Sequence, residues 1–169
     1  MKQQVIKSAI NKLELMDIAL HECHFFRNQE IDPDMKFPDF TYQGKLGIKT
    51  QGLVYTDQAE KEELNVFRCY VSFGVRAVHP DDAEKEEKES RIYYTIEADF
   101  RIDYHIKEDL TKEEISEFAD FNVVHNAWPF WRQHVLNITH NANLPRLIIP
   151  FFSGQDLAKN TTKKKHMKG

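Results

Sequence analysis

The sequence predicts an α+β domain: a four-stranded antiparallel sheet with helices from the C-terminal part of the chain packed on one face. Four segments up to Ile106 alternate apolar and polar residues, as strands with one buried face do, and no helical crossover separates them. After Ile106 the apolar residues recur at steps of three and four, which is the spacing of one helix face. A sheet and its covering helices form two layers around one core.

The four expected strands differ in how clearly the pattern marks them. The first runs from about Leu13 to Arg27 with one slip in the alternation, and the second covers about Phe40–Lys49. The third covers about Phe67–Ala77 and the fourth Arg91–Ile106. The fourth is the clearest, because every second residue in it is apolar or aromatic. Residues 1–11 predict an extension or a short helical turn.

Two connections within the sheet have distinct compositions. Residues 28–39 contain Pro33 and Pro38 and form a loop that carries the bulky apolar residues Met35 and Phe37. Residues 79–90 hold six Asp or Glu, without the glycine and the alternating ligand spacing of a calcium loop. We therefore expect a solvated hairpin connection between the third and fourth strands.

The helical region has a marked start and an internal proline. Thr111 and Glu114 form a capping-box pattern, in which hydroxyl and carboxylate satisfy the first amide donors of a helix. Pro129 lacks an amide donor, so it must kink the helix or begin a second one, for which Asn126 is the candidate cap. The helical spacing ends before Pro145, and an apolar run follows.

The composition favours a folded cytoplasmic protein. We expect one domain over residues 1–154 of the 169, and a basic, disordered tail over residues 155–169. No apolar run is long enough to cross a membrane, and the N-terminus lacks the apolar region of a signal peptide. The net charge is −4 even though five lysines lie in the final eleven residues, so the body of the chain is acidic. An acidic body repels nucleic acid and favours basic partners.

The residues that carry chemistry form no recognised catalytic or cofactor motif. His21, Cys23 and His24 are the densest group of metal-ligand types, but on a strand His21 and Cys23 share one face and His24 lies on the other. No nucleophile elbow, glycine-rich phosphate loop or zinc-protease motif occurs. We therefore predict no metal, no cofactor and no enzyme, with an acid–base role for His125 or His134 as the alternative.

Large apolar residues exceed what one sheet face needs. The chain has 12 Phe, 6 Tyr and 2 Trp. Trp128, Phe130 and Trp131 lie within four residues, and Phe151 and Phe152 follow later. Trp128 and Trp131 share a helix face while Phe130 projects elsewhere, so one flank fills the core and the other needs a second partner. We infer that the excess lies in an exposed groove or against another subunit.

The C-terminal half resembles a known family. The stretch His125-Asn-Ala-Trp-Pro-Phe-Trp-Arg-Gln-His-Val-Leu-Asn-Ile-Thr139, followed by Leu144-Pro-Arg-Leu-Ile-Ile-Pro-Phe151, is similar to the end of SecB-like protein-export chaperones. The order of strands, apolar crossover loop and helices is similar over about residues 10–154. The resemblance implies an ATP-independent holdase of the cytoplasm that binds unfolded or precursor polypeptides. It also implies a homotetramer, built as a dimer of dimers.

The resemblance further implies where clients and subunits bind. The client groove would combine the crossover loop with the segment after the helix: Met35, Phe37, Phe40, Leu147, Ile149, Phe151 and Phe152. Helix packing and subunit assembly would fall to Trp128, Trp131, Val135 and Ile138.

The end of the chain departs from the family pattern. Export members end in an acidic helical segment that engages the SecA motor, whereas the last residues of this chain are basic. Three functions therefore stay open: a preprotein chaperone for export, a dedicated chaperone of an antitoxin in a toxin–antitoxin module, and a carrier that encloses a hydrophobic small molecule.

Overall fold

The computed structural model describes residues 2–28, 36–56 and 63–152. Its elements are α1 (Lys2–Lys12), β1 (Leu13–Arg27), β2 (Thr41–Thr56), β3 (Glu63–Val78), β4 (Ile92–Ile106), α2 (Lys112–Phe118) and α3 (Val124–Asn141). Short 3-10 turns occupy Pro80–Asp82 and Glu87–Glu89, and a π-helical turn occupies Ala119–Val123. The expected tail, residues 155–169, and Met35 of the expected groove lie outside the described residues.

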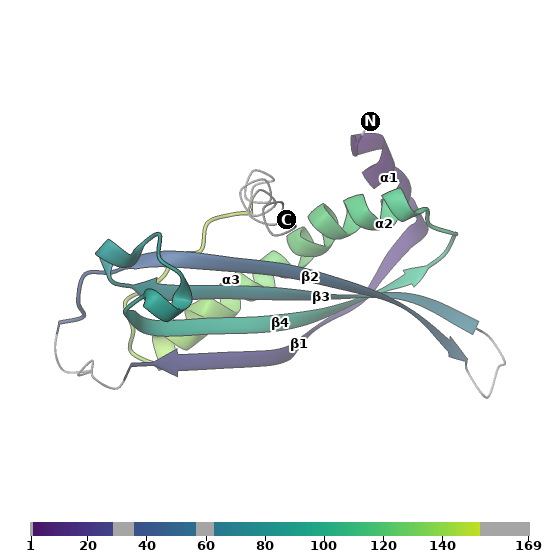
Figure 1. Ribbon diagram of the computed structural model, residues 1–169. Helices are drawn as coiled ribbons and strands as arrows, with labels where there is room; N and C mark the ends of the chain where they lie inside the picture. Colours follow the sequence, from purple (N-terminus) through teal and green to yellow (C-terminus); the bar gives the residue numbers. More distant parts are fainter. Residues whose placement is uncertain (1, 29–35, 57–62, 153–169) are drawn as a thin grey trace.

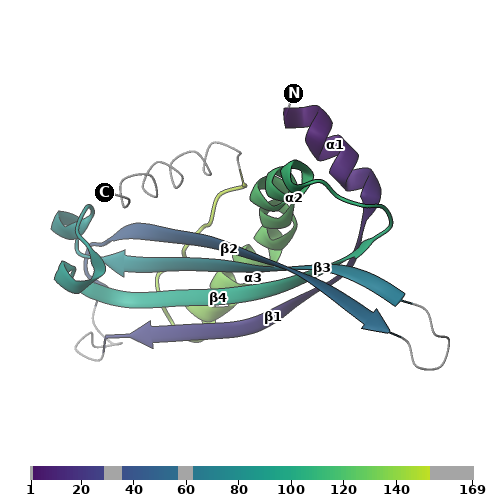
Figure 2. The ribbon, with the colours of Figure 1, turned by 45° about the vertical axis from the view of Figure 1, so that its right-hand side comes forward.

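The strands form one antiparallel sheet in the order β1-β4-β3-β2. β1 and β2 are therefore its two edges, and the chain passes from one edge to the other between them. Helices α2 and α3 lie along one face of the sheet, and no helix of the described residues covers the other face (Figure 1, Figure 2). The predicted fold class is confirmed.

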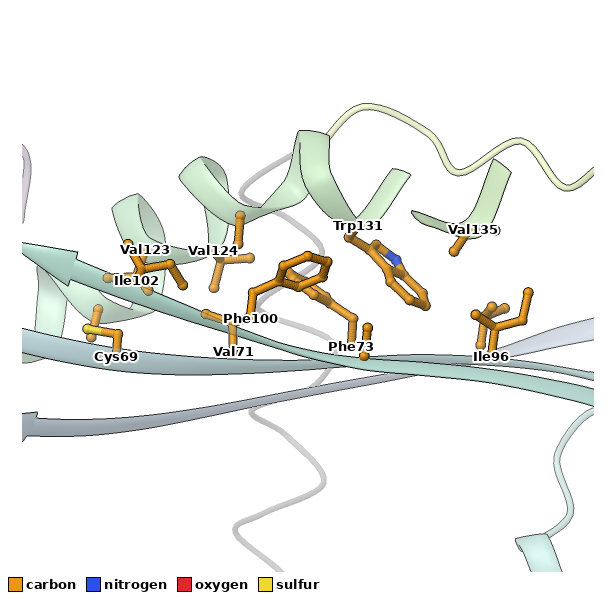
Figure 3. Close-up of a cluster of buried hydrophobic side chains, with 14 of the residues drawn as sticks. Cys69, Val71, Phe73, Ile96, Phe100, Ile102, Val123, Val124, Trp131 and Val135 are labelled. Atoms are coloured by element: carbon orange, nitrogen blue, oxygen red, sulfur yellow. The ribbon is translucent and has the colours of Figure 1, made fainter. Parts of the chain in front are cut away.

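The core lies between α3 and the two central strands. Alternate residues of β3 and β4, such as Phe73 and Ile96, point toward the helix and are buried (Figure 3). From the helix side, Trp131 and Val135 point back at them and are 3% and 0% exposed. The Trp131 indole stacks on the Phe73 ring, with centroids 5.5 Å apart and planes inclined by 13°. Full burial of a large apolar side chain of this kind stabilises the fold by about 1.5–3 kcal/mol.

Edge strand β1 departs from simple alternation twice rather than once. Its register against β4 shifts at Met16 and again at His21. As a result, Cys23 lies on the helix-covered face, whereas His24 lies on the open face with His21, whose ring is 5.0 Å from the Tyr70 ring. The prediction that His21 and Cys23 share a face is therefore wrong, because the β-bulge at His21 adds a residue to the alternation.

Helix α3 runs through Pro129 and does not restart there. The irregularity of the helical layer is instead the π-helical turn that joins α2 to α3. Asn126 does not cap a helix, since its side-chain amide donates to the hydroxyl of Tyr104 at 2.9 Å. The expected second helix that begins at Pro129 is therefore wrong, because packing of α3 on the sheet outweighs the hydrogen bond that Pro129 cannot make.

The first residues form the full helix α1 rather than a short turn, and α1 is bound to α2 through Glu114. Ser8 Oγ donates to Glu114 Oε1 at 2.6 Å, and Lys12 Nζ lies 2.9 Å from the same oxygen. The predicted capping box is also confirmed, because the Glu114 carboxylate accepts from the Thr111 amide while the Thr111 hydroxyl accepts in return. The Ser8 hydroxyl, the Thr111 amide and Lys12 lower the pKa of Glu114 to about 2.

The acidic connection between β3 and β4 is more ordered than a solvated hairpin. Asp82 is fully buried, and its carboxylate accepts from Arg91 Nε at 2.8 Å and lies 2.7 Å from Lys85 Nζ. The Gln43 side chain of β2 donates to three carbonyls of this connection. Hydrogen bonds from Arg91 and Lys85 hold the pKa of Asp82 well below its usual range. The other acidic residues described there are exposed, as expected.

Candidate client-binding surface

Residues 143–152, which we term the return segment, run back along α3 without regular secondary structure. Two side chains of α3 hold the return segment by its backbone: Trp128 Nε1 donates to the carbonyl of Pro150 at 2.8 Å, and Arg132 Nε donates to the carbonyl of Ile149 at 2.9 Å. Residues four apart on a helix face the same side, so Trp128 and Arg132 act on the same stretch of chain.

The apolar side chains of the return segment divide between core and solvent. Leu147 is buried in the core, and Ile149 and Phe152 are half-buried against it. Ile148 is 71% exposed and Phe151 is 80% exposed. The guanidinium carbon of Arg132 lies 4.4 Å from the centre of the Phe151 ring, which is a cation–π contact. Large apolar surface therefore faces water beside α3.

A hollow lies between α3 and the return segment, and we term it the α3 hollow. Its volume is about 260 Å³, and its lining residues are Pro129, Arg132, Gln133, Leu136, Arg146, Leu147, Ile148 and Ile149. The lining of the α3 hollow combines apolar side chains with two arginines and a glutamine, and the hollow is smaller than the roughly 300–1,000 Å³ of typical small-molecule pockets. It suits one or two side chains of a passing segment better than an enclosed ligand.

The other half of the expected groove, Phe37 and Phe40, belongs to a separate aromatic cluster. The two rings meet edge to face at 5.3 Å, and both contact Tyr94. The hydroxyls of Tyr42 and Tyr94 lie 2.9 Å apart, and burial raises the pKa of Tyr94 well above its usual range. Phe37 and Phe40 are half-buried on the core, so they present part of each ring to solvent.

The residues expected to serve helix packing and assembly face the sheet of their own chain. Trp131 and Val135 are buried there, and Trp128 and Ile138 are half-buried. Two large apolar residues of α3 are exposed: Leu136, which lines the α3 hollow, and Phe130, which is 46% exposed and whose ring lies 6.5 Å from that of Phe100.

Edge strand β1 exposes further apolar side chains on the helix-covered side of the sheet. The register places Leu15, Leu20 and Phe25 on that side, and they are 48%, 49% and 39% exposed. We term these three residues and Phe130 the β1 ledge. Nearby, the His134 ring packs against Phe100 and Trp131. Burial lowers the pKa of His134.

The described residues also bear on metal binding and thiol reactivity. No three His, Cys, Asp or Glu side chains among them gather in a position to bind a metal ion. Burial is the main cause that raises the pKa of the Cys69 thiol to about 12, which keeps it protonated and unreactive. No helix in the described ranges is both long and apolar enough to span a membrane.

The four-stranded antiparallel sheet, its edge-to-edge crossover and the long helix on one face define a SecB-like fold. A solved structure of this fold is the Mycobacterium tuberculosis SecB-like chaperone Rv1957 in complex with a ChAD peptide from the Rv1956 HigA1 antitoxin. It matches with a TM-score of 0.62 and 19% sequence identity, over 90% of this chain and 96% of that chain. No family model matches the sequence. No curated protein matches it either.

Sequence reasoning did not assign Arg132 a role, although the structure gives it two. It fixes the backbone of the return segment through Nε and covers the ring of Phe151 with its guanidinium. The available signal was its spacing of four residues from Trp128, which places two side-chain donors on one helix face. The spacing did not show which groups these donors bind, because the course of the return segment could not be derived from its composition.

Proposed function

We propose that this chain is an ATP-independent molecular chaperone, a holdase that binds unfolded or precursor polypeptides on apolar surface and has no catalytic activity or cofactor. The observation that carries the proposal is the exposure of Ile148 and Phe151 beside the α3 hollow, on a SecB-like fold. Burial of apolar area stabilises a complex by about 25 cal/mol per Å² without directional demands. Such a surface therefore accepts many unrelated segments.

Main-chain pairing supplies a second source of affinity that does not depend on sequence. β1 and β2 are the edges of the sheet, so each presents backbone donors and acceptors on its outer side. An extended client segment can add to such an edge by strand pairing. Exposed apolar residues together with an open edge suit an unfolded chain better than a compact partner.

The test is suppression of aggregation without nucleotide. A chemically unfolded client is diluted into buffer with increasing amounts of the protein, and light scattering is followed over time. We expect scattering to fall as the protein approaches stoichiometric amounts. Scattering that stays unchanged at a tenfold excess would refute the proposal.

A dedicated antitoxin chaperone is the second candidate, and one observation favours it. The solved SecB-like structure reported above holds a peptide of an antitoxin. To separate the two candidates, we would purify the protein from its own cells under mild conditions and identify co-purifying polypeptides by mass spectrometry. One dominant antitoxin supports the dedicated role, whereas many unrelated precursors support a general role, with SecA as the further partner to test by pull-down.

We further propose that the protein acts in the cytoplasm as a homotetramer, a dimer of dimers, with the β1 ledge at the subunit interface. Monomers rarely leave neighbouring large apolar residues in water, and Leu20 is 49% exposed on a strand with an open edge. Native mass spectrometry gives the mass of the assembly directly. A Leu20→Asp variant should shift that mass to smaller species, and a wild-type protein that is monomeric at micromolar concentration would contradict the proposal.

A further inference from the structure

The charge around the α3 hollow is opposite in sign to the charge of the whole protein. The chain carries a net charge of −4, and its body is more acidic still, because five of its lysines lie in the last eleven residues. Yet the sequence contains no Asp or Glu between Asp120 and Asp156. This range includes all of α3 and the return segment, and it holds Arg132 and Arg146.

Both arginines line the α3 hollow, and no acidic side chain among the described residues does. Arg132 is held on the wall by its bond to the carbonyl of Ile149 and its contact with Phe151. Arg146 is exposed and forms no hydrogen bond or ion pair with another residue in the described part of the chain. No group of the described residues therefore competes with a partner for the donors of its guanidinium.

Two opposing effects are small at this place. The C-terminus of a helix carries partial negative charge on its last carbonyls, but those of Ile138, Thr139 and His140 accept hydrogen bonds from the residues that follow. The acidic residues of the β3–β4 connection are not among the residues that line the hollow, and charges in water are screened over about 8 Å at physiological salt. The local arginines therefore dominate the potential in the α3 hollow.

Building on the proposed chaperone function, we infer that the α3 hollow selects client segments in which an acidic residue stands beside apolar residues. The apolar side chains would occupy the hollow next to Ile148, and the carboxylate would pair with Arg146 at the rim. The acidic body of the protein predicts a preference for basic clients, whereas the α3 hollow should prefer acidic segments.

The experiment uses the full-length protein and three fluorescent peptides with the same apolar residues, flanked by Asp, Asn or Lys. Fluorescence anisotropy gives the Kd of each for the wild type, for Arg146→Glu and for Lys49→Glu. Lys49 is exposed on β2, and the register places it on the uncovered face of the sheet, so its variant changes the net charge equally but far from the hollow. Arg146 is exposed too, so neither substitution removes packing from the core.

In the wild type we expect the Asp peptide to bind about two- to fivefold more tightly than the Asn peptide, and the Lys peptide to bind most weakly. Arg146→Glu should reverse the order of the Asp and Lys peptides, and Lys49→Glu should leave it unchanged. An equal effect of the two variants, or a wild type that binds all three peptides equally, would overturn the inference while leaving the chaperone proposal intact. Failure of all three peptides to bind would overturn both.

Discussion

Substitution of Phe151 by Ala tests whether the exposed ring serves clients or the fold. The ring is 80% exposed, so about four fifths of its burial energy is still available to a bound client. Full burial of a Phe side chain is worth about 1.5–3 kcal/mol, and the loss on substitution is therefore about 1.2–2.4 kcal/mol of binding free energy. Since 1.4 kcal/mol of binding free energy corresponds to a tenfold change in Kd, the Kd for an unfolded client should rise about seven- to fiftyfold.

The same substitution should change stability little. In the folded protein the Phe151 ring contacts the guanidinium of Arg132, and an exposed cation–π contact contributes about 0.5–1 kcal/mol. The bonds of Trp128 and Arg132 go to backbone carbonyls, so they remain when the ring is removed. Thermal unfolding should therefore stay within a few degrees of the wild type.

The assay is a titration of a labelled, permanently unfolded client, with Val54→Ala as the matched control. Val54 is a 61% exposed apolar residue near the end of β2, outside the α3 hollow and the return segment. We expect Val54→Ala to bind as the wild type does. If Phe151→Ala binds as tightly as the wild type, or if both variants lose affinity equally, the return segment is not the client surface.

The remaining predictions concern the fold, the assembly and the charged contacts. Trp131→Asp buries an unpaired charge against Phe73, and this should cost several kcal/mol of folding free energy and abolish cooperative thermal unfolding. If the variant stays a folded tetramer, the assignment of that helix face is mistaken. Phe130→Asp, on the exposed flank of the same helix, should keep the near-ultraviolet circular dichroism of the wild type and lower the assembly mass in native mass spectrometry. For Glu114, the pKa of about 2 in the folded protein lies below the ordinary 4.5, so its stabilisation is present above pH 4.5 and is lost as the pH falls toward 2. Urea unfolding at pH 5.5 and pH 3 should show this loss, and Glu114→Gln should make the difference smaller. Asp82→Asn removes the negative partner of Arg91 and Lys85 and should lower the urea midpoint at neutral pH, whereas Glu84→Gln, at an exposed position in the same connection, should not.

The fold was predictable because its signals are local and repeated. The alternation along β3 and β4 marks one buried face each, and the structure buries that face, as at Val71 and Phe100. The capping box at Thr111 was equally readable, since it depends on residues three apart. The bulge at His21 was not, because an extra residue in an edge strand leaves an exposed, mixed pattern that fits either register.

The site was less predictable because it depends on contacts between distant segments. The sequence shows that Leu147 to Phe152 is apolar, but it does not show which of these side chains turn inward. The structure divides them through two helix side chains that act on backbone carbonyls, and a carbonyl has no signature in a sequence. The order of the β3–β4 connection was not predicted for a related reason, since the Gln43 side chain that donates to its backbone carbonyls lies on a strand far away in the chain.

The exposure of the two apolar side chains follows from how the return segment is held. An extended chain points successive side chains to opposite sides, and Leu147 is fixed inward by the core. The carbonyls of Ile149 and Pro150 are fixed toward α3 by Arg132 and Trp128, so the segment cannot rotate to bury Ile148 or Phe151. Folding thus leaves these apolar side chains exposed to water instead of burying them, and a protein that binds unfolded segments requires such exposed apolar surface. Loss of the Trp128 and Arg132 donors would free the segment to collapse onto its own core and would close the surface to clients.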